Sequence, residues 1–192
     1  WQFGATDDAP SINNTLTNSA CPTFDVTYLL DGAVTVDVIK TLDEYGIVAI
    51  TSHGDTFYNG ILSWWQDRWG WNWFSQVVFL TGQTANTANR LANEVDLRQG
   101  RLAITTHPTG NGYYAILPSF ISYYSGSGYP DSLVYVGSCR STFNNSLADA
   151  FTGAGAQSFL GYSEYVNSAF AGTTGVNFFG RLVNDPTIDN VG

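Results

Sequence analysis

Two apolar runs that each end at a chemically reactive side chain constrain this chain more than any other feature. One run covers 46–52 and leads to His53, and the other covers 132–138 and leads to Cys139. Apolar, β-branched runs of this kind are typical of strands that are buried on both faces of a parallel sheet. If the two strands are parallel neighbours, His53 and Cys139 lie at the same carboxyl edge, where chemistry gathers in α/β sheets. An imidazole beside a thiol can remove its proton and stabilise the thiolate.

The rest of the chain alternates strand-like and helix-like patterns, which predicts a single α/β domain over 1–192. The first 24 residues are polar and are expected to be irregular. Strands are expected at 25–30, 46–52, 76–80, 101–106, 112–117, 132–138 and 157–162. Helices are expected at 37–45 with Thr35 as N-cap, at 84–97, from Pro118, from Asn145 and around 176–183. The first strand, helix and second strand would form a right-handed β-α-β unit.

Composition and charge restrict the partners. Only 12% of the residues are charged and the net charge is −9, which disfavours nucleic acid and anionic membrane surfaces. A basic ligand or peptide is more compatible with this charge. No stretch is long and apolar enough for a membrane span, and no motif indicates a cofactor or a zinc site. The absence of methionine predicts a processed fragment of a larger precursor, and the composition favours an exported protein.

The two reactive segments also match the pattern of a known family. An apolar strand with His53-Gly54, followed later by an apolar strand and Cys139, resembles the clan of caspase-like cysteine peptidases. The segment 146–163 is similar to the helix and strand that follow the cysteine in bacterial gingipain-like and clostripain-like members. The resemblance covers roughly 25–183. It implies a three-layer sandwich with a mainly parallel central sheet and helices on both faces.

Three features depart from the family pattern. Gly137 and Ser138 precede the cysteine where caspases carry Gln-Ala, so the caspase preference for aspartate is not implied. His53 and Cys139 are farther apart in the chain than the about 50 residues of caspases. The first strand and helix of the family are not recognisable in 1–24, so this region is either truncated or degenerate.

The resemblance implies a catalytic dyad. Cys139 would be the nucleophile, and His53 would act as general acid and base. The backbone N–H groups of Gly54 and Cys139 would form the oxyanion hole. Asp55 follows directly and is interpreted as a turn residue, because the dyad requires no third carboxylate.

The resemblance also places the substrate pocket. Gly137, Ser163 and Glu164 would surround the residue that precedes the cleaved bond. A carboxylate at Glu164 would select arginine or lysine there, and the alternative is a solvated residue at a strand end. The expected partner is therefore a peptide or protein substrate.

Other residues leave alternatives open. His107 also follows an apolar run and is a competing base, and a disulfide between Cys21 and Cys139 would block the nucleophile. A dense aromatic segment is either a hydrophobic cover on the sheet or an exposed surface for carbohydrate or another protein. That segment contains Trp64, Trp65, Trp69, Trp71 and Trp73.

These patterns give two functional hypotheses. The first is an exported bacterial cysteine endopeptidase that uses His53 and Cys139 and cleaves after arginine or lysine. The second is a non-catalytic binding or assembly module with the same fold, which would use the tryptophan-rich segment 64–73. Fold resemblance alone cannot separate the two, because function resides in the site.

Overall fold

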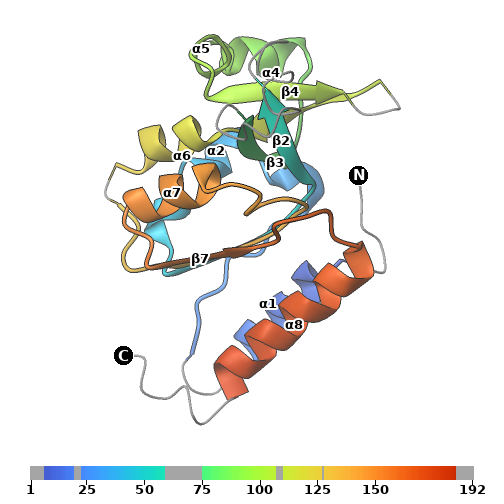
Figure 1. Cartoon of the computed structure of the whole chain (residues 1–192), viewed down its shortest axis with the longest axis vertical. Helices are drawn as coiled ribbons and strands as arrows, with labels where there is room; N and C mark the ends of the chain where they lie inside the picture. Colours follow the sequence, from blue (N-terminus) through green and yellow to red (C-terminus); the bar gives the residue numbers. More distant parts are fainter. Residues whose placement is uncertain (1–6, 20–22, 59–74, 107–109, 127, 185–192) are drawn as a thin grey trace. The chain divides into compact units, whose positions relative to one another are not determined.

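The structure of the chain is a computed structural model that describes residues 7–19, 23–58, 75–106, 110–126 and 128–184 (Figure 1). The chain divides into two compact units. The smaller unit combines residues 1–29 with 166–192, and the larger unit comprises residues 30–165. All the candidate catalytic and pocket residues belong to the larger unit. The prediction of a single domain over 1–192 stays a prediction.

The smaller unit contains two helices that pack along each other, α1 (Ala9–Thr17) and α8 (Ser168–Asn184) (Figure 1). Pro10 lies in the first turn of α1, where its missing N–H is harmless. Ile12 and Leu16 are one helical turn apart and both are buried. The expectation of an irregular start is therefore wrong for Ala9–Thr17. Helix α8 confirms the expected last helix, with Phe179 fully buried.

The larger unit contains a three-stranded parallel sheet. Its strands, in sheet order, are β1 (Ile47–Thr51), β6 (Leu133–Gly137) and β7 (Ser158–Gly161). Burial on both faces is confirmed for β6, where four consecutive residues are buried. It is wrong for β1, where Val48 and Ile50 are buried but Ala49 is exposed. The reason is position: β6 is the central strand and β1 lies at an edge.

The described residues of this unit also form a four-stranded antiparallel sheet. Its sheet order is β2 (Gly54–Tyr58), β3 (Ser75–Thr84), β5 (Gly112–Ile116) and β4 (Leu102–Thr106). The expected hairpin of the last two strands is confirmed, with Thr106 opposite Gly112. A short loop can join only antiparallel neighbours. The chain is thus α/β as expected, but the expectation of a mainly parallel sheet fails for these four strands.

The expected strand at 25–30 is also wrong. Residues 23–30 have no regular structure, and Leu29 and Leu30 are exposed. None of the described strands pairs with this segment, so the β-α-β unit does not form. The helix expected at 37–45 is shorter: α2 (Val36–Ile39) is followed by the 3₁₀ turn η3 (Leu42–Glu44). Thr35 caps α2 as expected, because its Oγ1 accepts a hydrogen bond from the Val38 N–H at 3.3 Å.

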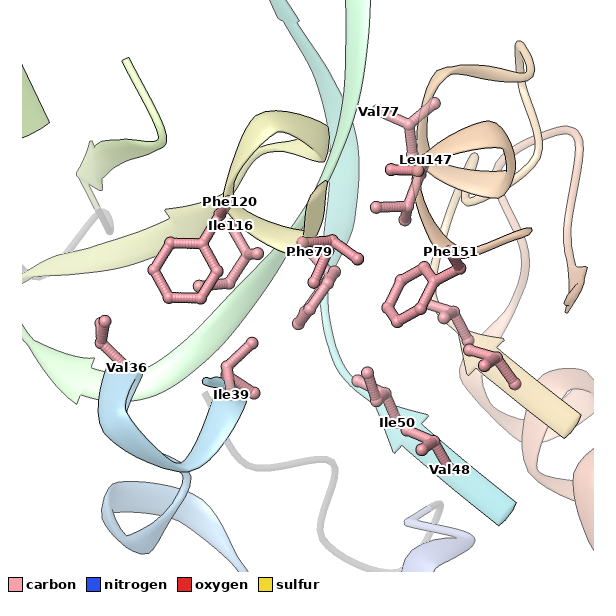
Figure 2. Close-up of a cluster of buried hydrophobic side chains, with 14 of the residues drawn as sticks. Val36, Ile39, Val48, Ile50, Val77, Phe79, Ile116, Phe120, Leu147 and Phe151 are labelled. Atoms are coloured by element: carbon pink, nitrogen blue, oxygen red, sulfur yellow. The ribbon is translucent and has the colours of Figure 1, made fainter. Parts of the chain in front are cut away.

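One hydrophobic core joins both sheets to helices α2, α6 (Pro118–Tyr124) and α7 (Ser146–Gly153) (Figure 2). The helices expected from Pro118 and from Asn145 are confirmed by α6 and α7. The core side chains labelled in Figure 2 are Val36, Ile39, Val48, Ile50, Val77, Phe79, Ile116, Phe120, Leu147 and Phe151. This shared core fixes the parallel sheet against the antiparallel one, which matters because the candidate site lies where the chain crosses between them.

The helix expected at 84–97 is two short helices, α4 (Thr87–Ala92) and α5 (Glu94–Arg98). Their apolar stripe faces solvent, since Leu91 is 74% and Val95 is 67% exposed. Asp96 is buried instead and pairs with Arg101, whose Nε lies 2.5 Å from Asp96 Oδ1. The Tyr124 hydroxyl donates to the same carboxylate at 2.9 Å. A buried carboxylate therefore needs both of these partners.

The cluster of Asp96, Arg101 and Tyr124 predicts that the folded protein loses stability at alkaline pH. Burial, together with the hydrogen bond to Asp96, raises the pKa of Tyr124 to about 12. Tyr124 in the folded protein therefore holds its proton more tightly than in the unfolded protein, where the pKa of a tyrosine is about 10. This stabilisation is complete below about pH 10 and is lost as the pH rises through about 12. We expect wild type to lose stability between these values, with a smaller loss in Tyr124→Phe. Urea unfolding at pH 8 to 12 measures the free energy of unfolding of each protein, and Tyr123→Phe at an exposed tyrosine is the control. If the free energy of unfolding falls equally with pH in wild type, Tyr124→Phe and Tyr123→Phe, the prediction is wrong.

Candidate active site

The pairing of β1 with β6 brings the two reactive segments together. The strands are parallel, and Thr51 at the end of β1 pairs with Gly137 at the end of β6. His53 lies two residues beyond Thr51, and Cys139 lies two residues beyond Gly137. Both residues are half-buried. The expectation that these distant strands are parallel neighbours is confirmed, and His53 and Cys139 follow the same sheet edge.

The chain crosses from the parallel to the antiparallel sheet at His53. The Ser52 hydroxyl donates to the Leu80 carbonyl at 2.6 Å, and the Leu80 N–H donates to the His53 carbonyl at 2.9 Å. The next pair, Gly54 with Phe79, is then a non-hydrogen-bonded pair of the antiparallel ladder. The Gly54 N–H therefore points away from β3, which suits the oxyanion-hole role implied by the family resemblance.

Gly54 also lies directly against the cysteine loop. A Cβ at position 54 would be 2.5 Å from Ser138 Oγ and 2.9 Å from the carbonyl oxygen of Cys139. Real Cβ atoms essentially never come so close to other heavy atoms. Only glycine allows the backbone after His53 to approach the backbone of Cys139 in this way.

The loop after Cys139 is held to the end of β7. Ser141 Oγ donates to the Val136 carbonyl and accepts from the Tyr162 N–H, both at 2.9 Å. The Thr142 N–H donates to the Tyr162 carbonyl at 2.9 Å, and the Arg140 N–H donates to the Glu164 carbonyl at 3.1 Å. The segment after β7 thus joins the same edge as His53 and Cys139.

The three expected pocket residues have different surroundings. Ser163 and Glu164 are exposed and follow β7 at this edge. Gly137 is buried, and a Cβ there would be 2.9 Å from the Tyr135 ring. Packing beneath Tyr135 gives Gly137 a structural reason to be glycine, and its contact with substrate stays a prediction.

Asp55 is not a turn residue, because it lies in strand β2. Its carboxylate accepts from Arg140 Nη1 at 3.3 Å and from the Tyr165 hydroxyl at 3.1 Å. The sequence pattern predicts neither Arg140 nor Tyr165 as a site residue, although Arg140 directly follows Cys139 in the sequence. Burial lowers the pKa of Arg140, but the hydrogen bonds and charges of Tyr165 and Asp55 outweigh this, and its pKa is raised. Arg140 therefore carries its positive charge directly beside the candidate nucleophile Cys139.

Several sequence predictions concern residues outside the described ranges. These are the competing base His107, the cysteine Cys21, and the five clustered tryptophans Trp64, Trp65, Trp69, Trp71 and Trp73. Because Cys21 lies outside these ranges, the alternative of a disulfide between Cys21 and Cys139 stays a prediction. Within the described ranges, no group of three or more His, Cys, Asp or Glu side chains is placed to hold a metal ion.

Comparison with protein-family models, curated proteins and solved structures finds no match for this chain. Among the residues that the structure describes, no helix has both the length and the apolar character that crossing a membrane requires. The geometry of the site itself is therefore the basis on which a function can be inferred.

Proposed function

We propose that this protein is a cysteine endopeptidase that uses a His53–Cys139 dyad. The observation that carries the proposal is the β1–β6 register, which leaves a histidine and a cysteine two residues beyond paired strand ends. The close approach of Gly54 to the Cys139 backbone supports it. The proposal includes a caspase-like three-layer arrangement with helices on both faces that lacks the first strand, and an exported bacterial protein.

The dyad would cleave a peptide bond in two steps. The Cys139 thiolate attacks the scissile carbonyl carbon, and the π electrons move onto the oxygen, which the Gly54 and Cys139 N–H groups stabilise. When the C–N bond breaks, His53 gives its proton to the leaving amine and a thioester remains. His53 then takes a proton from water, and the resulting hydroxide attacks the thioester carbonyl carbon. When the C–S bond breaks, the carboxylic product leaves and the Cys139 thiolate is restored beside protonated His53.

Cleavage after arginine or lysine is the proposed specificity. Glu164 is exposed at the edge that carries the dyad, and its backbone is bonded to the cysteine loop through the Arg140 N–H. An accessible carboxylate there attracts a basic side chain, and the net charge of −9 favours basic substrates over acidic ones. Asp55 is less suited to this role, because its charge is already paired with Arg140.

Active-site labelling tests the proposal. Peptidyl chloromethyl ketones that end in arginine, lysine or aspartate are incubated with the protein, and the modified residue is located by mass spectrometry. We expect arginine and lysine probes to label Cys139, with at least about 10²-fold slower labelling in His53→Ala because the thiol loses its base. Cys21→Ser and His107→Ala serve as controls for the second thiol and the second imidazole, and both should label like wild type.

The rival hypothesis predicts a different result. If Cys139→Ala labels as well as wild type, and peptides that end in arginine, lysine or aspartate stay intact, the protein is not a cysteine peptidase. A binding or assembly module that uses segment 64–73 for a protein or carbohydrate partner would then be the better hypothesis.

A further inference from the structure

The residue directly after the nucleophile has an unusual backbone. Arg140 has φ +56, a left-handed conformation that residues other than glycine adopt only when their surroundings hold them there. Two backbone hydrogen bonds hold it: its N–H donates to the Glu164 carbonyl at 3.1 Å, and its carbonyl accepts from the Phe143 N–H at 2.9 Å. The conformation sets the direction in which the chain leaves Cys139.

The side chain of Arg140 returns across the site to the strand that follows His53. Its Nη1 lies 3.3 Å from Asp55 Oδ1 and 3.1 Å from Thr56 Oγ1. Its guanidinium carbon lies 3.6 Å above the centre of the Phe143 ring. Only 13% of the side chain is exposed. A planar guanidinium stacked on an aromatic ring and bonded on its edge is fixed in orientation, which a lysine cannot reproduce.

Tyr165 donates a hydrogen bond to the same carboxylate. Its hydroxyl lies 3.1 Å from Asp55 Oδ1 and 3.2 Å from Oδ2, and its ring centre lies 5.2 Å from the guanidinium carbon of Arg140. Asp55, Arg140 and Tyr165 therefore connect the segments that follow β1, β6 and β7. Asp55 is the next residue after Gly54, and Arg140 is the next residue after Cys139.

We propose that Arg140, held by Asp55 and Tyr165, is a positioning residue that sets the Gly54 and Cys139 N–H groups at the spacing needed to bind the oxyanion. This inference rests on the proposed peptidase function. The ion pair joins the residues next to the two proposed donors, so it fixes the distance between those donors. Arg140 itself touches neither the thiol proton nor the leaving group in this role.

Two thiol reactions separate a positioning role from other roles. A peptide aldehyde adds to Cys139: the S–C bond forms, the carbonyl π electrons move onto oxygen, and the thiol proton passes by way of His53 to that oxygen, which lies in the oxyanion hole. Iodoacetamide alkylates the same thiolate by displacing iodide and develops no such oxyanion. If the Gly54 and Cys139 N–H groups are misaligned, the aldehyde binds more weakly, whereas the rate of alkylation by iodoacetamide stays the same.

The test compares Arg140→Met, Arg140→Lys and Asp55→Asn with wild type. We expect Arg140→Met to lower kcat about tenfold to a hundredfold and to raise the inhibition constant of a peptide aldehyde by the same factor. KM and the iodoacetamide rate should change less than about threefold. Arg140→Lys should restore part of the loss, and the double variant Arg140→Met with Asp55→Asn should be no worse than the worse single variant, because the two residues act as one unit.

The control is Arg98→Met, which removes an arginine from an exposed ion pair with Glu94 and should match wild type. The inference is overturned if Arg140→Met and Asp55→Asn retain full activity. It is also overturned if the iodoacetamide rate falls together with kcat, or if the loss only equals the unfolded fraction seen by circular dichroism. A wild type that neither cleaves peptides nor binds the aldehyde overturns the peptidase proposal as well, so the two failures are distinguishable.

Discussion

Gly54→Ala should lower kcat/KM of the proposed peptidase about 10²-fold while the protein remains folded, because an added methyl group displaces the loop that carries Cys139. The new Cβ would be 2.9 Å from both the Cys139 carbonyl oxygen and Ser138 Cβ, and 2.5 Å from Ser138 Oγ. Ser138 is 1% exposed, so its side chain has no solvent-filled space to enter. The strain must therefore move the backbone that carries Cys139.

Peptide hydrolysis and thermal unfolding measured on the same samples check this prediction. Gly46→Ala is the matched control, because Gly46 immediately precedes β1 and a Cβ there meets nothing within 4 Å. Adding Ser138→Gly to Gly54→Ala removes two of the three close contacts and should restore part of the activity. If Gly54→Ala stays within about threefold of wild type, the close approach of Gly54 has no bearing on the position of Cys139.

The sequence predicted the parts of this site that depend on local pattern. The runs that end at His53 and Cys139 carry enough β-branched and aromatic residues to predict β1 and β6, and the structure pairs them in parallel. The hairpin of β4 with β5 and the inner face of α7 could also be predicted from local sequence pattern. Leu147, Ala150, Phe151 and Ala154 recur at helical spacing and predict an inner face. The first three are buried in α7, whereas Ala154 lies directly after the helix and is half-buried.

The sequence could not show what depends on distant partners. The stripe with Leu91 and Val95 has a helical period, but a period does not say which face meets the core. Asp96 occupies the buried face of α5 because Arg101 and Tyr124 satisfy its carboxylate. Segment 25–30 has strand-like residues, but none of the described strands pairs with it, and strand propensity depends strongly on such context.

Arg140 illustrates the same limit within the site. Its left-handed backbone and its contact with Asp55 follow from the packing of three loops at one sheet edge. The sequence shows Asp55 directly after Gly54, but the position of Asp55 in β2 depends on the ladder with β3. A basic residue beside a candidate nucleophile and an acidic residue beside the candidate histidine are the signals that could have suggested the pair.

The β2–β3 ladder, which holds Gly54, depends on a second close approach, between Gly82 of β3 and the residues around Asp31. Gly82 of β3 donates its N–H to the Val34 carbonyl at 3.0 Å, next to the 3₁₀ turn η2 (Asp31–Ala33). A Cβ at position 82 would overlap the carbonyl group of Asp31. Asp31 already has φ +47, so the turn is confined to a conformation that few residues adopt. If the turn moves away from β3, the hydrogen bond from the Gly82 N–H to Val34, the residue directly after the turn, is strained or broken.

Gly82→Ala should therefore destabilise the fold by at least about 3 kcal/mol, at the upper end of the cost of overpacking, because the clash is with backbone. Urea unfolding followed by tryptophan fluorescence measures this, and the midpoint should fall without a change in slope. Gly32→Ala is the matched control from the other side of the contact: a Cβ there meets nothing within 4 Å, and the variant should unfold within about 1 kcal/mol of wild type. Equal midpoints for the two variants would show that η2 does not pack on β3 as closely as the structure has it, and the anchoring of β3 beside His53 would then need another source.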